Sequence, residues 1–123
     1  MLNTLDLVQY GPVIPVIVLQ KVEEAVPLAQ ALVAGGVRVL EVTMRTPVAL
    51  ASIEAIAKAV PDAIVGAGTI RSAADARAAR DAGSLFGVSP GYTPEVGRAC
   101  KDAGLPLLPG VATSSEVMTA QAD

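Results

Sequence analysis

The sequence predicts an α/β fold in which short parallel strands alternate with helices along the 123 residues. Two observations predict it. An Ala-Gly pair precedes an apolar run three times, in VAGGVRVLEV, DAGSLFGVSP and DAGLPLLPGV. Between these runs lie stretches of strong helix formers with charges on one side, such as VALASIEAIAKAV. Strands and helices that alternate at this spacing are typical of parallel βαβ units.

The boundaries of each element follow from turn and cap residues. Glycine just beyond a helix is the common left-handed C-cap, so we expect helices to end before Gly35, Gly36, Gly83 and Gly104. Helix starts are indicated by Thr46-Pro47, Ser72 with Asp75, Thr93-Pro94, and Thr113 with Glu116.

These signals predict five strands and five helices. The expected strands cover residues 13–19, 37–44, 63–68, 85–89 and 106–111. The expected helices cover residues 22–34, 47–60, 73–82, 94–103 and a segment from about 114. Pro27 lies inside the first expected helix, which therefore starts later or kinks there.

Two architectures use such units, an open doubly wound sheet and a (β/α)₈ barrel. The first expected strand, in PVIPVIVLQKVEEA, is followed by no glycine-rich phosphate loop, which favours the barrel. A complete barrel takes about 250 residues. Residues 1–123 are therefore predicted to form a single incomplete barrel domain, with about the first four and a half βα units and without strands six to eight.

Composition excludes several functions. Nine Lys and Arg residues stand against twelve Asp and Glu, and only three residues are aromatic, so we expect no nucleic-acid binding. No apolar run approaches about 18 residues and no signal peptide is evident, so we expect a cytoplasmic protein without a membrane partner. With no histidine and a single cysteine, Cys100, we expect no disulfide and no metal. Any catalysis would then use Asp, Glu, Lys, Ser, Thr or Tyr.

The stretch LEVTMRT, residues 40–46, places a carboxylate and a guanidinium in an apolar run. Alternate side chains of a strand share a face, so Glu41, Thr43 and Arg45 would face the barrel interior near the strand's carboxyl end, where barrel enzymes have their active sites. A structural Glu41–Arg45 ion pair is the alternative. On an extended strand the two residues would be roughly 13 Å apart, too far for a direct pair. We therefore expect each to have another partner, such as an anionic substrate and a proton to be moved.

Small residues follow the next three strands, in AIVGAGT, LFGVSPG and PLLPGVAT. Thr69 and Ser89 could supply hydroxyls there. Four glycines would let a ligand approach the backbone, or would only make tight turns: Gly66, Gly68, Gly91 and Gly110. Together with the charged pair on the second strand, these residues predict a small site that accepts an anion.

Four stretches occur in order from about Gly11 to Met118: PVIPVIVLQKVEEAVPLAQALVAGGVRVLEVTMRT, IVGAGTI, FGVSPGYTPEV and PLLPGVATSSEVM. In order and spacing they resemble the 2-keto-3-deoxy-6-phosphogluconate aldolase / 4-hydroxy-2-oxoglutarate aldolase family. The resemblance implies a class I aldolase on a TIM barrel, usually a homotrimer, that needs no cofactor. Such an enzyme cleaves 2-dehydro-3-deoxy-6-phosphogluconate to pyruvate and glyceraldehyde 3-phosphate, or 4-hydroxy-2-oxoglutarate to pyruvate and glyoxylate.

The resemblance also implies roles for individual residues. The family's proton-shuttling glutamate in LEVT corresponds to Glu41. The arginine of the same strand and the threonine of GAGT, which help hold the pyruvate carboxylate, correspond to Arg45 and Thr69. The proline of SPG, which lines the pocket, corresponds to Pro90. A class I aldolase forms an iminium between a lysine and the 2-oxo carbon, and a partly desolvated Glu41 with a raised pKa would move the protons.

In this family the Schiff-base lysine lies on strand six, in a stretch like KFFPA, and the phosphate site lies on strands seven and eight. Because the sequence stops at Asp123, before these elements, we expect the isolated chain to be inactive. Lys58 and Lys101 fall on helices at positions typical of solvated faces. Lys21 follows the first strand but lies at a helix start among acidic residues, so a solvated charge is also its expected role.

Two classes of function stay open. The first is an aldolase, including the alternative that acts on 2-dehydro-3-deoxy-6-phosphogalactonate, whose activity requires the missing half. The second is a non-catalytic half-barrel that binds a 2-oxo acid or oligomerises. Expected partners are a 2-oxo acid or phosphorylated sugar acid, together with further copies of the chain or a complementary C-terminal half. Association is expected because a half-barrel leaves strand edges unpaired and interior residues uncovered.

Overall fold

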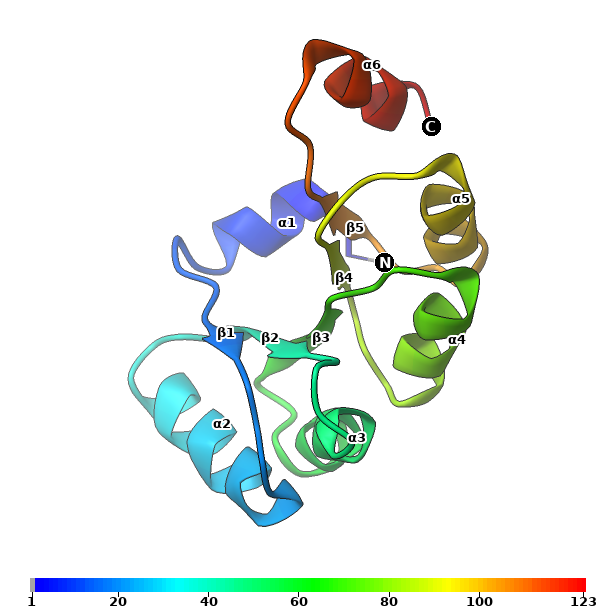
Figure 1. Ribbon diagram of the computed structural model, residues 1–123. Helices are drawn as coiled ribbons and strands as arrows, with labels where there is room; N and C mark the ends of the chain where they lie inside the picture. Colours follow the sequence, from blue (N-terminus) through cyan, green and yellow to red (C-terminus); the bar gives the residue numbers. More distant parts are fainter. Residues whose placement is uncertain (1) are drawn as a thin grey trace.

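A computed structural model describes residues 2–123 as five parallel strands, four of them joined to the next strand through a helix (Figure 1). The strands are β1 (Val16–Ile17), β2 (Val39–Thr43), β3 (Ile64–Gly68), β4 (Gly87–Ser89) and β5 (Leu107–Pro109). The helices are α1 (Thr4–Gln9), η1 (Val22–Glu24), α2 (Ala25–Ala34), α3 (Ala49–Ala59), α4 (Ala73–Asp81), α5 (Pro94–Asp102) and α6 (Ser114–Ala122).

Strand order decides between the two expected architectures. The strands lie in the order β1-β2-β3-β4-β5, and each pairs in parallel with the next along the chain. A doubly wound sheet reverses its order at a switch point, whereas a (β/α)₈ barrel adds strands consecutively. The predicted barrel-type fold is therefore confirmed.

The two faces of the sheet pack against different partners. Leu40, Val42 and Val65 point outward and form one core with the helices that connect the strands. Val39, Ile64 and Phe86 point inward and form a second core with Leu7 of α1. This alternation agrees with the predicted inward face of β2, because residues at odd positions of that strand share the inner side.

The cap residues are mostly as predicted. Gly36, Gly83 and Gly104 have left-handed backbones, with φ of 91°, 96° and 68°. The Ser72, Thr93 and Thr113 hydroxyls accept hydrogen bonds from backbone N–H groups at the starts of α4, α5 and α6.

The prediction of a helix start at Thr46-Pro47 was wrong. Helix α3 begins at Ala49, and its N-cap, Val48, makes no side-chain capping bond. The Thr46 hydroxyl instead donates to the Leu19 carbonyl at 2.7 Å, because the turn after β2 folds back against the end of β1. Pro27 lies in the first turn of α2, behind the short helix η1, so the predicted later start of that helix is confirmed.

Sequence patterns did not predict α1, which lies on the concave side of the sheet, opposite α3, α4 and α5 (Figure 1). Asn3 and Asp6 form a reciprocal capping box at its start. Leu7 is its one buried residue and packs into the inner core. Arg38, at the entry to β2, lies 5.3 Å from the centre of the Tyr10 ring just after the helix.

The sheet is open at both sides within residues 2–123, because β1 pairs only with β2 and β5 only with β4. Beside β1, the side chains of Val13, Val16 and Val18 are 46–60% exposed. Leu5 and Val8 of α1 are also exposed. None of the described helices is long and apolar enough to cross a membrane.

Candidate active site

Glu41 lies on the inner face of β2, opposite Gly66 of β3 and Val16 of β1. It is buried, with 8% of its surface exposed. Its carboxyl group reaches along β3 and lies against Gly68, not against its register partner. Burial raises the pKa of Glu41 from its ordinary value, and the nearby charge of Arg45 partly offsets this rise. A carboxyl group with a raised pKa is suited both to accept and to return a proton.

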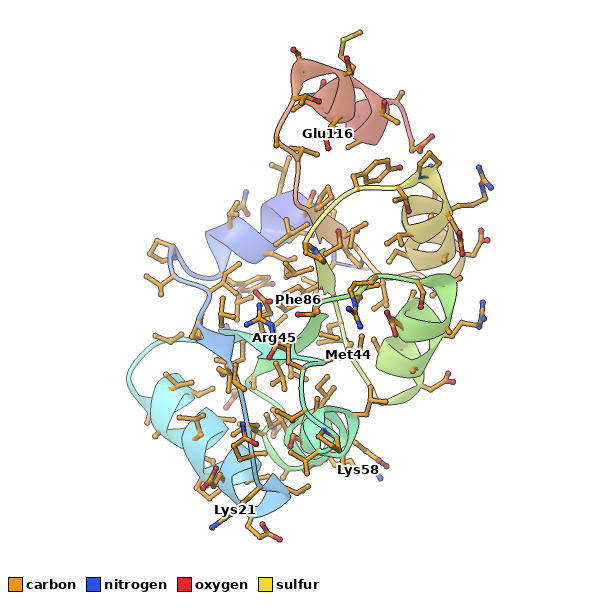
Figure 2. All side chains as sticks on the ribbon, in the orientation of Figure 1. Lys21, Met44, Arg45, Lys58, Phe86 and Glu116 are labelled. Carbon is orange, nitrogen blue, oxygen red and sulfur yellow. The ribbon has the colours of Figure 1, made fainter. Side chains whose placement is uncertain are left out.

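Arg45 lies at the carboxyl end of β2, next to Met44 (Figure 2). The strand ends at Thr43 and the chain turns at Met44, so the extended spacing assumed from the sequence is wrong beyond Thr43. The turn brings the guanidinium near enough for its charge to act on the Glu41 carboxyl. No direct ion pair joins the two among residues 2–123, where the one ion pair is Lys58 with Glu54. Arg45 is exposed, which leaves its guanidinium accessible to an anion.

Thr43 is fully buried, and its hydroxyl donates to the Ile17 carbonyl at 3.2 Å. This bond ties the end of β2 to β1. The residue therefore positions its neighbours in the strand, and its hydroxyl already has a partner.

Thr69 follows β3 directly, at the same edge of the sheet, and is half-buried. Its backbone is left-handed, with φ of 66°, the only positive φ among the described residues other than glycine. A β-branched residue adopts this conformation only when its surroundings enforce it. The next residue, Ile70, holds the chain in this conformation. The Ile70 N–H donates to the Val88 carbonyl at 3.1 Å, and the Ile70 side chain is fully buried.

Four glycines were expected either to let a ligand approach the backbone or to make tight turns, and two of them lie against protein side chains instead. A Cβ atom at Gly66 would lie 2.5 Å from the Phe86 ring, and one at Gly68 would lie 2.0 Å from Glu41 Oε1. At Gly110 the nearest atom would be the Pro90 carbonyl oxygen, at 2.3 Å. Gly91 has open space around it. The first two glycines thus shape the inner wall beneath and beside Glu41.

Pro90 and Ser89 mark the end of β4. Pro90 is exposed beside the Gly110 backbone, so it lies on the same edge of the sheet as Thr69 and Arg45. Ser89 is 2% exposed, and its hydroxyl has no hydrogen-bond partner. No group of metal-binding side chains occurs within the described part of the chain.

None of the three lysines contacts the Glu41 carboxyl within the described residues. Lys58 is paired with Glu54 on α3, and Lys101 on α5 donates to the backbone carbonyl of Asp123. Lys21 is exposed at the start of η1 and makes no capping bond. Figure 2 shows Lys21 and Lys58 projecting outward, far below Arg45 in that view. Within residues 2–123, therefore, no lysine amine accompanies the Glu41 carboxyl.

A comparison with known protein families shows the family of this chain. The sequence profile of KDPG and KHG aldolases matches residues 5–122. The chain belongs to this family. The KHG/KDPG aldolase of Escherichia coli strain K12 is 55% identical to it over 108 residues, which make up 88% of this chain and 51% of that protein.

Solved structures give the same result. The KDPG aldolase of Zymomonas mobilis ZM4, crystallised with 3-phosphoglycerate, superposes with a TM-score of 0.90 at 45% identity, over 95% of this chain and 56% of that one. The KDPG aldolase of Legionella pneumophila, with pyruvate captured as a covalent carbinolamine, gives 0.90 and 45%, over 94% of this chain and 56% of that one. The chain spans about half the length of the curated relatives it matches.

Proposed function

We propose that this chain provides the acid–base and carboxylate-binding part of a class I aldolase site. The site would cleave 2-dehydro-3-deoxy-6-phosphogluconate to pyruvate and glyceraldehyde 3-phosphate, and 4-hydroxy-2-oxoglutarate to pyruvate and glyoxylate. The observation that carries the proposal is the buried carboxyl group of Glu41, which lies towards the carboxyl end of a parallel β/α sheet in a member of this family. Burial raises the pKa of this group.

In the proposed reaction a lysine amine adds to the 2-oxo carbon, and loss of water gives an iminium. The ionised Glu41 carboxylate takes the proton from the C4 hydroxyl as the C3–C4 bond breaks, and the bonding electrons move into the iminium. The aldehyde leaves. Glu41 then returns its proton to C3, and hydrolysis of the resulting iminium releases pyruvate and the lysine. A carboxyl group with a raised pKa suits this exchange, because each turn of the cycle needs both of its protonation states.

Arg45 and Thr69 would hold the substrate carboxylate. Arg45 is exposed and has no ion-pair partner among the described residues, so its guanidinium can form a forked contact with an incoming carboxylate. Thr69 lies on the neighbouring strand end, where its fixed backbone would aim the hydroxyl at the same group. Pro90, exposed at the end of β4, would form the adjacent pocket wall.

The lysine would come from a segment outside these 123 residues. Lys21, Lys58 and Lys101 occupy exposed positions with no contact to the Glu41 carboxyl. The Legionella relative, in which pyruvate is a covalent carbinolamine, supports the use of an amine nucleophile. We accordingly propose that residues 1–123 alone release no pyruvate. The working enzyme would contain a complementary C-terminal half and would form a homo-oligomer.

A chimera tests this proposal. Residues 1–123 are joined to the C-terminal half of the Zymomonas mobilis relative, and pyruvate release is measured with both substrates. We expect turnover of both. Glu41→Gln should lower kcat at least about 100-fold, because it removes a general acid–base group. Glu54→Gln changes the carboxyl of α3 that pairs with Lys58, and it should leave turnover unchanged. Full activity of the Glu41→Gln chimera would contradict the proposal.

A further inference from the structure

The carboxyl group of Glu41 rests on a strand other than its own. A Cβ atom added to Gly68 of β3 would lie 2.0 Å from Glu41 Oε1, 2.8 Å from its Cδ and 2.9 Å from its Cγ. These separations are far below van der Waals contact, so any side chain at position 68 would compete with the carboxyl for one space. The absence of a side chain at Gly68 therefore provides the slot that Glu41 fills.

The backbone at Gly68 is held from both sides. Its carbonyl accepts a hydrogen bond from the Met44 N–H at 2.9 Å, which fixes it to the end of β2. The next residue, Thr69, is in the left-handed conformation, and Ile70 is anchored by its bond to the Val88 carbonyl. The Ile70 side chain also fills the space beside Gly87, where a Cβ would lie 2.6 Å from Ile70 Cδ1. These contacts hold the β3 backbone in place at this point. The clash made by a side chain at position 68 would therefore be relieved by movement of the Glu41 side chain.

The other inward glycine of β3 behaves differently. A Cβ at Gly66 would meet three atoms of the Phe86 ring at 2.5–2.6 Å, and this ring is fully buried in the inner core. The ring has no free space to enter, so an added methyl group there would strain the core. Gly66 thus packs against a rigid, buried ring beneath the site. Gly68 instead packs against the end of the flexible Glu41 side chain, which can move.

We infer that Gly68 is a positioning residue: its bare backbone lets the Glu41 carboxyl lie flat against β3, and this contact fixes where the acid–base group is presented to the substrate. The consequence for catalysis rests on the proposed function. The contact itself does not, because it is a property of β2 and β3 alone.

The test is a titration of the Glu41 carboxyl, followed by carbon-13 NMR, in the 123-residue chain and its variants. Gly68→Ala should push the carboxyl off β3 into the open interior, where it is more hydrated, and should shift its pKa down towards the ordinary value. Gly91→Ala is the matched control, because it adds a methyl group at the same edge of the sheet where nothing lies within 4 Å. Its titration curve should overlay that of the wild type.

A second measurement separates this contact from a general effect of the added methyl group. Asp is one methylene shorter than Glu, so Gly68→Ala should lower the free energy of unfolding less in a Glu41→Asp background than in the wild type. If Gly68→Ala fails to fold, folding of the Gly68→Ala/Glu41→Asp double variant supports the inference, and its failure overturns it.

An unchanged Glu41 pKa in a folded Gly68→Ala chain, or an equal loss of stability in both backgrounds, would also overturn the inference. Neither readout requires turnover. A chimera without aldolase activity would therefore refute the proposed function and leave this result standing.

Discussion

Side chains at the ends of β2 and β3 set the chemistry of the site. Glu41 is buried against the Gly68 backbone, and Arg45 modulates its pKa from the adjacent turn. Thr69 is held in a left-handed conformation that few threonines adopt. Each of these features depends on a neighbouring strand.

The pattern LEVTMRT alone was enough to predict an inward Glu41 at the carboxyl end of a strand. The contact of its carboxyl group with Gly68 and the left-handed backbone of Thr69 were not predicted, because both result from contacts between strands far apart in sequence. The turn at Met44 was missed for a similar reason, since the Met44 N–H bonds to the Gly68 carbonyl of β3.

Replacement of Glu41 by Gln should change how stability depends on pH. Burial raises the pKa of Glu41 above its ordinary value of about 4.5, so the folded state binds the proton more tightly than the unfolded chain does. The free energy of unfolding should therefore fall as pH rises from about 4.5 through the raised pKa.

Glu41→Gln should lack this fall and be more stable than the wild type at pH 7. Urea unfolding at several pH values measures it, with Glu54→Gln as the control on an exposed helix face. Identical pH profiles for the wild type and Glu41→Gln would refute the assigned cause.

Replacement of Thr69 by Gly should separate binding from stability. Glycine accepts the left-handed backbone without strain, so the free energy of unfolding should stay the same or rise. Loss of a hydroxyl that bonds a carboxylate costs about 1.5–3 kcal/mol, which should raise the KM of the chimera roughly tenfold or more with little change in kcat. Thr69→Asn tolerates the same backbone and keeps a hydrogen-bonding group, so it should retain part of the affinity. An unchanged KM for Thr69→Gly would argue against the carboxylate contact.

Local sequence patterns were enough to predict where several helices begin, but not the length of the strands. Helices α4, α5 and α6 begin where their capping residues predicted, because a cap is a bond within four residues. The strands are shorter than predicted: β1 pairs only at Val16–Ile17, although the apolar run covers residues 13–19. Helix α1 was missed although Asn3 and Asp6 form a capping box, because its six residues bury only Leu7 and so show no apolar periodicity.

Helix α1 should stabilise the sheet through that one residue. Leu7 is fully buried against Val39, Ile64 and Phe86. Leu7→Ala should lower the free energy of unfolding by about 2–5 kcal/mol, the usual cost of such a cavity. Leu5→Ala, on the same helix at 70% exposure, should change it by less than about 0.5 kcal/mol. Equal effects of the two substitutions in thermal unfolding would show that α1 does not pack as described.

Within residues 2–123, the molecule is a parallel sheet with two unpaired sides and an apolar interior open beside β1. Consecutive strand order follows from the short βα repeats, and this part of the architecture was predictable from the rhythm of the sequence. The exposed valines near β1 agree with the prediction that interior residues lack an opposite wall.

The 123-residue chain should therefore associate through this face. Sedimentation should show assembly that grows with protein concentration, because exposed strand edges and apolar surface pair readily. Val13→Lys with Val18→Lys should weaken it, whereas Met118→Lys, at an exposed position on α6, should not. A monomer at every concentration would contradict this expectation.

The most direct measurement is the intact mass of the chain after incubation with pyruvate and borohydride, which reduces an iminium to a stable adduct. The chain alone should gain no mass, because none of its three lysines contacts the Glu41 carboxyl. After addition of a complementary C-terminal half, one reduced pyruvate should appear on that half, and Glu41→Gln should slow its formation. An adduct on Lys21, Lys58 or Lys101 of the chain alone would contradict the account, because it would place the nucleophile within these residues.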